Sequence, residues 1–99
     1  MTTYELLITD DAEEDLNDAV EWYRLANSGL KDKFTKAVAS CLESIRRNPD
    51  QYPLVYKDVR RALLHKFPYA VFYFVFDETV IVQACFHTSR NPSNWQNRV

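Results

Sequence analysis

The sequence predicts an α+β domain in which a helix hairpin packs on one face of a small antiparallel sheet, in the order β-α-α-β-β-β. Two observations predict it. Two amphipathic helical patterns follow one another in the first half of the chain, and a run rich in β-forming and aromatic residues, Val59–His87, fills much of the second half. At 99 residues the chain is long enough for one hydrophobic core and too short for two. We therefore expect a single domain over residues 1–99.

The helix hairpin is predicted by apolar spacing and by end signals. A short apolar run, Tyr4–Thr9, predicts a strand before it. Asp11, followed three residues later by Glu14, resembles a capping box, so the first helix is expected over Asp11–Ala26. Ser28 can cap a second helix, whose apolar residues recur at helical spacing from Leu30 to Ile45. The residues expected to be buried against the sheet are Leu16, Val20, Phe34, Val38, Leu42 and Ile45.

The β-rich run divides into three predicted strands, Val59–Phe67, Tyr69–Phe76 and Val80–His87. The middle run is apolar at every position, which is typical of a central strand covered on both faces. Strict alternation along the last strand sorts its side chains by face. One face is expected to hold Val80, Val82, Ala84 and Phe86, and the other Ile81, Gln83, Cys85 and His87. We expect any site on the second, more polar face, at the C-terminal end of this strand.

Composition excludes several classes of protein. A single glycine argues against a phosphate-cradling loop, and no apolar run is long enough to span a membrane. The first ten residues lack the basic and apolar regions of a signal peptide, so we expect a soluble, cytoplasmic protein with no membrane association. Cys41 and Cys85 lie in a helical and a strand pattern without metal-ligand spacing, which favours two buried thiols and no metal or cofactor.

Charge is distributed unevenly along the chain. Residues 1–21 hold eight acids and no base, so the remaining 78 residues carry twelve bases against six acids. A basic remainder of this kind can face phosphate or an acidic partner peptide, although each charge can equally be solvated surface.

One loose constellation could carry chemistry: Arg60, Arg61 and Lys66 near one strand, with His87 and Arg90 at the end of another. Metal-independent RNA cleavage needs an acid or base of near-neutral pKa and cations for the phosphate charge, which a histidine and arginines supply. Ordinary strand-end and edge-strand charges are the alternative. Alternation puts Arg60 and Lys66 on the face opposite Arg61, so at most one set lines a given site.

Taken together, the chain resembles the RelE/ParE family of toxins from type II toxin–antitoxin systems. The resemblance rests on motifs in a fixed order along nearly the whole length. They are Ala12, Asp15 and Leu16; Trp22-Tyr23; Asn48-Pro49 with Tyr52-Pro53; Val59-Arg60-Arg61; Phe67-Pro68-Tyr69-Ala70-Val71-Phe72-Tyr73; and His87 through Trp95.

The resemblance implies a small toxin neutralised by a cognate antitoxin in a hetero-oligomer. Some family members cleave mRNA on the ribosome and others inhibit DNA gyrase without cleaving RNA; a non-toxic binding module of the same fold is the alternative. In the nuclease case Arg61, His87 and Arg90 would be catalytic. Arg60, Lys66 and Trp95 would then contact RNA or a partner, with Trp95 alternatively anchoring the tail.

Overall fold

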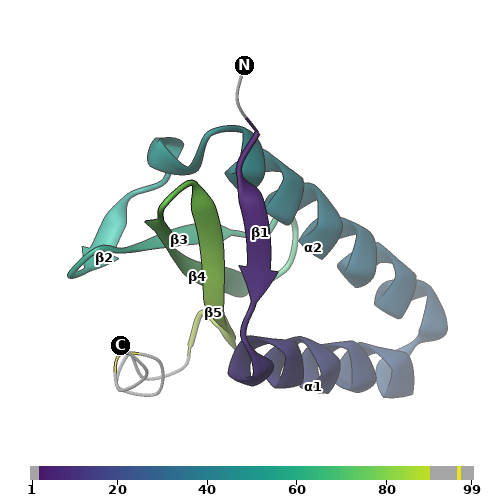
Figure 1. Ribbon diagram of the computed structural model, residues 1–99. Helices are drawn as coiled ribbons and strands as arrows, with labels where there is room; N and C mark the ends of the chain where they lie inside the picture. The colour runs from purple at the N-terminus through teal and green to yellow at the C-terminus, as the bar shows by residue number, and fades with distance from the viewer. Residues whose placement is uncertain (1–2, 90–95, 97–99) are drawn as a thin grey trace.

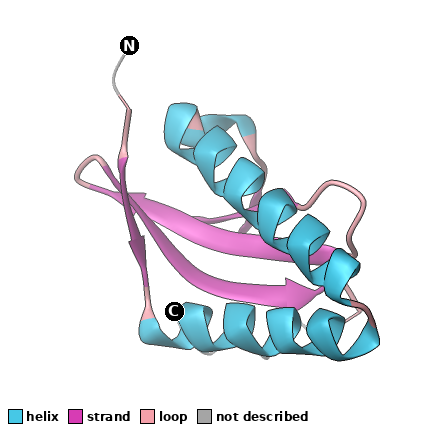
Figure 2. Cartoon of the chain, turned by 90° about the vertical axis from the view of Figure 1, so that its right-hand side faces the viewer, coloured by secondary structure: helices cyan, strands magenta, loops and turns pink. Residues whose placement is uncertain are grey.

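The computed structural model describes residues 3–89 and residue 96. Two helices lie on the same side of a five-stranded sheet (Figures 1 and 2). The elements in chain order are β1 (Glu5–Ile8), α1 (Asp10–Ala26), α2 (Ser28–Arg47), a 3-10 turn η1 (Pro49–Gln51), β2 (Leu54–Tyr56), β3 (Val59–Leu63), β4 (Tyr69–Phe76) and β5 (Thr79–His87). The predicted fold class is confirmed.

The helix hairpin turns on a single residue, Asn27. Its backbone N–H donates to the Tyr23 carbonyl and ends α1, while its side-chain oxygen accepts the Gly29 N–H at 2.8 Å and begins α2. A Cβ at Gly29 would lie 3.1 Å from that oxygen, so the lone glycine suits the cap. Ser28 is therefore not the cap that the sequence predicts. The predicted capping box is also wrong, because Thr9 caps α1 by accepting the Ala12 N–H.

The core between helices and sheet is built around Phe34, which is fully buried. Its ring lies 4.9–5.3 Å from those of Tyr23, Phe67 and Tyr69, which ties both helices to the start of β4. Of the residues expected in the core, Phe34, Val38 and Ile45 are buried. Leu16, Val20 and Leu42 are partly buried and pack against the same cluster.

The sheet is mixed, and this differs from the antiparallel sheet that the sequence predicts. Its strand order is β1-β5-β4-β3-β2, with β1 parallel to β5 and the other pairs antiparallel. The short run Tyr4–Thr9 predicts a strand, but a run of this length carries no information on the direction of the strand in the sheet. The added strand, β2, pairs with β3 through a tight turn in which Lys57 has a φ of 51°.

The hairpin of β4 and β5 is formed as predicted. Asp77 and Glu78 both have positive φ, 51° and 65°, which is the conformation of a two-residue hairpin turn. The strand predicted over Val59–Phe67 ends earlier, at Leu63. It stops there because the chain turns before Tyr69, with Lys66 at a φ of 68°.

A β-bulge interrupts β5. Phe72 pairs with Ala84 but the next residue, Tyr73, pairs with Val82, so Gln83 is the extra residue of the bulge. Beyond it the alternation of side chains is reversed. Val80, Val82 and Cys85 belong to the core under the helices, whereas Ala84 and Phe86 belong to a second cluster on the other face. The predicted sorting of this strand by strict alternation is therefore wrong past Gln83.

Neither helix in the described part of the chain combines the length and the apolar run that a bilayer-spanning segment requires.

Candidate functional site

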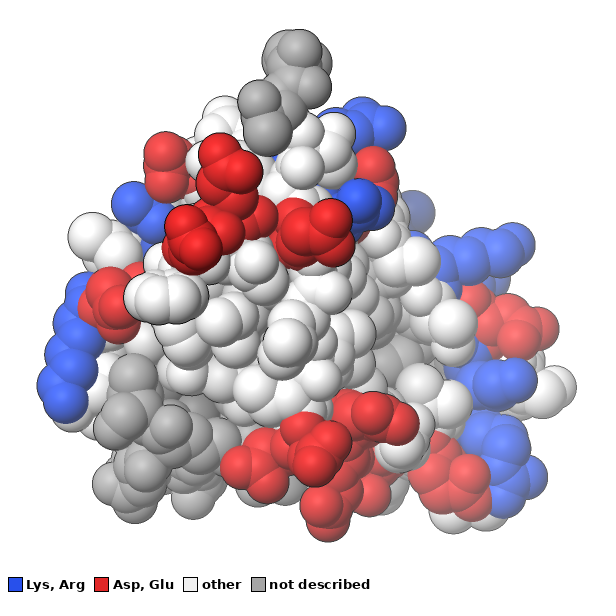
Figure 3. All heavy atoms as spheres, viewed as in Figure 1, with Lys and Arg blue, Asp and Glu red and all other residues white. Residues whose placement is uncertain are grey.

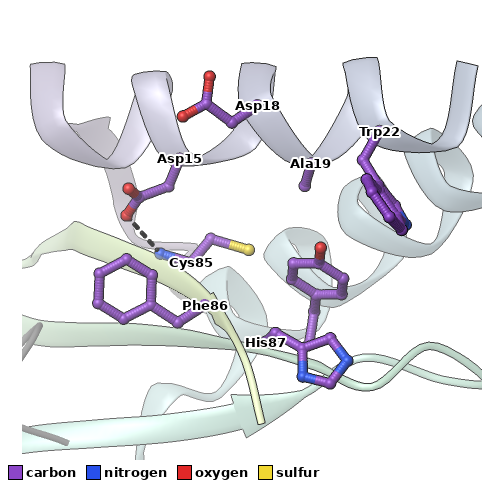
Figure 4. Close-up of a pocket in the computed structure, with 8 residues that line it drawn as sticks. Asp15, Asp18, Ala19, Trp22, Cys85, Phe86 and His87 are labelled. Atoms are coloured by element: carbon purple, nitrogen blue, oxygen red, sulfur yellow. Dashed lines mark hydrogen bonds between the residues drawn. The ribbon is translucent and has the colours of Figure 1, made fainter. Parts of the chain in front are cut away.

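A cavity of about 220 Å³ opens between α1 and the C-terminal half of β5 (Figure 4). It lies on the helix side of the sheet, next to the point where β5 ends. The residues that line it are Asp15, Asp18, Ala19, Trp22, Tyr69, Cys85, Phe86 and His87.

The wall formed by α1 follows from helical spacing. Asp15, Asp18 and Trp22 are three and four residues apart, so they lie on one side of the helix. Ala19 lies among them and is buried, and its short side chain leaves room between helix and strand. In Figure 4 the side chains of Asp15, Ala19 and Trp22 point from α1 toward the strand that carries Cys85 and His87, and the Asp18 carboxylate lies beside the helix.

The other wall is an open stretch of strand edge. The ladder between β1 and β5 ends at the pair of Ile8 with Val82, so α1 takes the place of β1 beside the rest of β5. The Cys85 N–H donates to Asp15 Oδ2 at 3.1 Å (Figure 4). This bond satisfies an edge amide and fixes the distance between α1 and β5.

His87 stands at the mouth of the cavity, at the end of β5. It pairs with Tyr69 across the ladder, and the two rings make an edge contact with centroids 5.3 Å apart. The Ser89 N–H donates to His87 Nδ1 at 3.1 Å, and the Ser89 hydroxyl lies 2.8 Å from the same atom. Because Nδ1 accepts a backbone N–H, the neutral ring carries its proton on Nε2.

Arg60 is held by backbone carbonyls. Its Nη1 donates to the Tyr52 carbonyl at 2.6 Å and to the Asp50 carbonyl at 3.4 Å, and Nη2 lies 3.7 Å from the Asp50 carboxylate. The side chain is 23% exposed. Arg60 therefore fastens the turn before β2 to the sheet, a structural task that the sequence did not suggest.

Arg61 projects from the opposite face of the sheet to His87. Its cross-strand partner is Phe72, which belongs to the cluster on the side away from the helices. His87 pairs with Tyr69, which packs against the helix-side core. The nuclease hypothesis expects Arg61 and His87 to converge on one point. The structure places them on opposite faces of the sheet instead.

The other predicted site residues are distributed as follows. Lys66 is exposed in the turn between β3 and β4, away from the cavity lining. Arg90 and Trp95 lie outside the described residues.

Trp22 and Asp15 were predicted only as parts of a family motif and of the acidic helix. Their seven-residue spacing placed them on one side of α1, but nothing in the sequence indicated that the edge of β5 lies opposite.

The two thiols are poor nucleophiles. Burial, with smaller contributions from Asp15 and Cys41, raises the pKa of Cys85 to about 12. Burial also raises the pKa of Cys41 to about 11. A thiol is reactive as its thiolate, so Cys85 contributes an inert surface to the cavity.

The charge around the cavity is negative on the side of α1. Figure 3 shows acidic side chains gathered along the lower edge of the molecule, where α1 lies. The first turn of that helix carries Asp10, Asp11 and Glu13, where the helix dipole favours carboxylates.

Two helices on one face of a five-stranded mixed sheet are the architecture of toxins from type II toxin–antitoxin systems. A chain of a chromosomal ParDE toxin–antitoxin system from P. aeruginosa superposes with a TM-score of 0.75 at 16% identity, covering 86% of this chain and 96% of that one. A chain of a RelBE toxin–antitoxin complex from Mycobacterium tuberculosis superposes with a TM-score of 0.58 at 17% identity, covering 87% and 99%. At these identities the likeness concerns the fold.

The sequence itself carries the family assignment. The model of the ParE toxin of the type II toxin–antitoxin system, parDE, matches residues 6–92. The chain belongs to this family. No curated protein sequence matches it.

Proposed function

We propose that the chain is the toxin of a type II toxin–antitoxin pair that arrests growth by binding DNA gyrase, and that a cognate antitoxin neutralises it. The observation that carries the choice of a binding mechanism is the separation of Arg61 from His87 on opposite faces of the sheet. Such a toxin works in the cytoplasm, where its target lies.

The separation matters because RNA cleavage is chemistry at a single phosphate. Proton transfer and charge stabilisation must reach the same atoms within hydrogen-bonding distance. The position of Arg61 and His87 on opposite faces argues against such joint action, and Arg60 is engaged with the Tyr52 and Asp50 carbonyls. Target binding sets no such requirement, since arginines spread over a surface can each contact a partner.

Ribosome-dependent mRNA cleavage with His87 as the acid or base is the competing function. It is favoured by one observation, the half-buried position of His87 at the mouth of a cavity with its Nδ1 fixed by Ser89. A non-toxic binding module is the third outcome.

The test is inducible expression of the chain alone and with the antitoxin encoded beside it, followed by two readouts. We expect growth arrest that the antitoxin relieves, inhibition of DNA supercoiling by purified gyrase, and no new 5′ ends in mRNA. His87→Ala should keep the toxicity, as should its matched control His65→Ala, an exposed histidine in the turn before β4.

The contrary result is equally clear. The nuclease would replace the gyrase inhibitor if new mRNA ends appear, if their rate of formation drops about 10²–10⁴-fold in His87→Ala, and if that rate is unchanged in His65→Ala. Harmless expression without either readout would leave a binding module.

A further inference from the structure

We propose that the cavity beside α1 is the docking site for an arginine side chain of the antitoxin. The choice of partner rests on the proposed function, whereas the recognition of a guanidinium rests on the cavity alone. At this cavity the toxin would present carboxylates to a basic segment of the antitoxin. The excess of bases in residues 22–99 predicts the opposite kind of contact, with an acidic partner segment.

The walls of the cavity have the chemistry that a guanidinium requires. Asp15 and Asp18 place two carboxylates on one side, within one helical turn of each other. The rings of Trp22 and Tyr69 line the same space. Carboxylates bind a guanidinium through charge-assisted hydrogen bonds, and aromatic faces attract it by cation–π contact.

The size of the cavity favours a side chain over a free small molecule. Its volume of about 220 Å³ is below the range of about 300–1,000 Å³ that is usual for small-molecule sites. One long side chain entering from the surface fits this space better than a cofactor or a drug-sized metabolite.

The surface around the cavity indicates a macromolecular partner. Trp22 is 66% exposed and Leu25, three residues further along the same side of α1, is 71% exposed. Large apolar side chains exposed together beside a polar pocket are typical of protein-binding surfaces. The N-terminal half of α1 is acidic, so the complementary segment carries a base opposite Asp15 and Asp18 and an apolar side chain opposite Trp22 and Leu25.

The first experiment titrates the isolated chain with N-acetyl-arginine amide and follows the Trp22 indole N–H by NMR. The control ligand is N-acetyl-citrulline amide, which has the same shape without the charge. We expect saturation with a dissociation constant on the order of 1 mM for the arginine amide, the affinity within reach of a ligand of about fifteen non-hydrogen atoms. The citrulline amide should not saturate over the same range.

Variants assign the effect to the cavity. Asp15→Asn combined with Asp18→Asn should raise the dissociation constant of the arginine amide at least about fivefold. The asparagine at position 15 keeps an oxygen that can accept the Cys85 N–H, and thermal unfolding checks that the fold is intact. Asp18→Asn alone should also weaken binding, and Glu13→Gln is its matched control: each removes one charge from α1, and Glu13 lies roughly 140° around the helix axis from Asp18.

The second experiment repeats the titration on the complex with the co-expressed antitoxin, where the arginine amide should no longer shift the Trp22 signal. Asp18→Lys should weaken antitoxin binding at least tenfold more than Glu13→Lys does. If the complex binds the arginine amide as well as the free chain does, the antitoxin does not use the cavity and the proposal is overturned. Equal binding of the citrulline amide overturns it as well.

A third outcome concerns the chain's own arginines. If the free chain binds the arginine amide only after Arg90→Gln and Arg98→Gln are introduced, the tail fills the cavity and the antitoxin does not. A chain that arrests no growth and co-purifies with no antitoxin fails the proposed function and antitoxin docking together. The titration of the free chain still decides whether the cavity takes a guanidinium.

Discussion

Replacing Arg60 or its neighbour Arg61 by alanine separates an arginine that is held by backbone carbonyls from an exposed one on the same strand. The Arg60 guanidinium donates to the Tyr52 carbonyl at 2.6 Å, and a hydrogen bond from a charged donor contributes about 1.5–3 kcal/mol to the free energy of unfolding. The ion pair with Asp50 adds little, because that carboxylate is 76% exposed and solvent screens it. Arg60→Ala should therefore cost about 1.5–3 kcal/mol, and Arg61→Ala within about 0.5 kcal/mol.

Urea unfolding followed by tryptophan fluorescence measures both values. In a domain of this size about 1 kcal/mol shifts Tm by about 4–8 °C, so Arg60→Ala should lower Tm by about 6–24 °C. Arg61→Ala should melt as the unsubstituted chain does, and any toxicity it loses is then a loss of target binding. Equal unfolding free energies for the two variants would show that Arg60 does not fasten the turn before β2, and the structural assignment would be wrong.

Three further predictions concern stability and reactivity. Phe34→Ala should lower the free energy of unfolding by about 3–5 kcal/mol, whereas Phe76→Ala, at a ring that is 68% exposed, should change it by less than about 0.5 kcal/mol; similar losses in urea unfolding would contradict the core assignment. Thr9→Ala removes the cap of α1 and should cost about 1 kcal/mol in the same assay, so an unchanged midpoint would refute the cap. Burial raises the pKa of Cys41 to about 11 and of Cys85 to about 12, so neither thiol should react with a disulfide reagent at pH 8 until the chain unfolds. These folded-state pKa values lie above the ordinary 9.0, so the contribution of the two thiols to the free energy of unfolding is complete below about pH 9 and is lost as the pH rises toward 11–12. The loss is about 1.4 kcal/mol per pH unit for each thiol. Replacing Cys85 by alanine should therefore reduce the dependence of the unfolding free energy on pH in this range.

The parts of the fold that the sequence predicts are those decided by local spacing. The apolar stripe from Leu30 to Ile45 spans more than four helical turns, so its period alone identifies α2 and the side it buries. The run Tyr69–Phe76 is apolar throughout, and Ala70–Tyr73 are buried in the structure between the core under the helices and the cluster around Phe72, whereas Val75 and Phe76 at its end are exposed. Both elements are also continuous enough that a few misplaced boundary residues do not change their identity.

The parts that local spacing does not determine depend on tertiary contacts. The direction of β1 is set by the strand it meets, and β2 is three residues long, too short for a period. The role of Arg60 depends on where the Tyr52 carbonyl lies, which no spacing predicts. The cavity depends on α1 lying along the edge of β5 left open beyond Val82, so its residues come from segments about seventy positions apart.

The bulge at Gln83 shows how one such contact decides the site. With Val80 and Val82 under the helices, a regular strand would send His87 to the other face, which is the face of Arg61. The extra residue reverses the alternation, so His87 instead joins Tyr69 on the helix side, beside the acids of α1. The same shift turns the Cys85 amide toward α1, where Asp15 accepts it. One inserted residue thus takes the histidine away from Arg61 and places it in an acidic, aromatic cavity, which suits the binding of a cationic partner better than the cleavage of a phosphodiester.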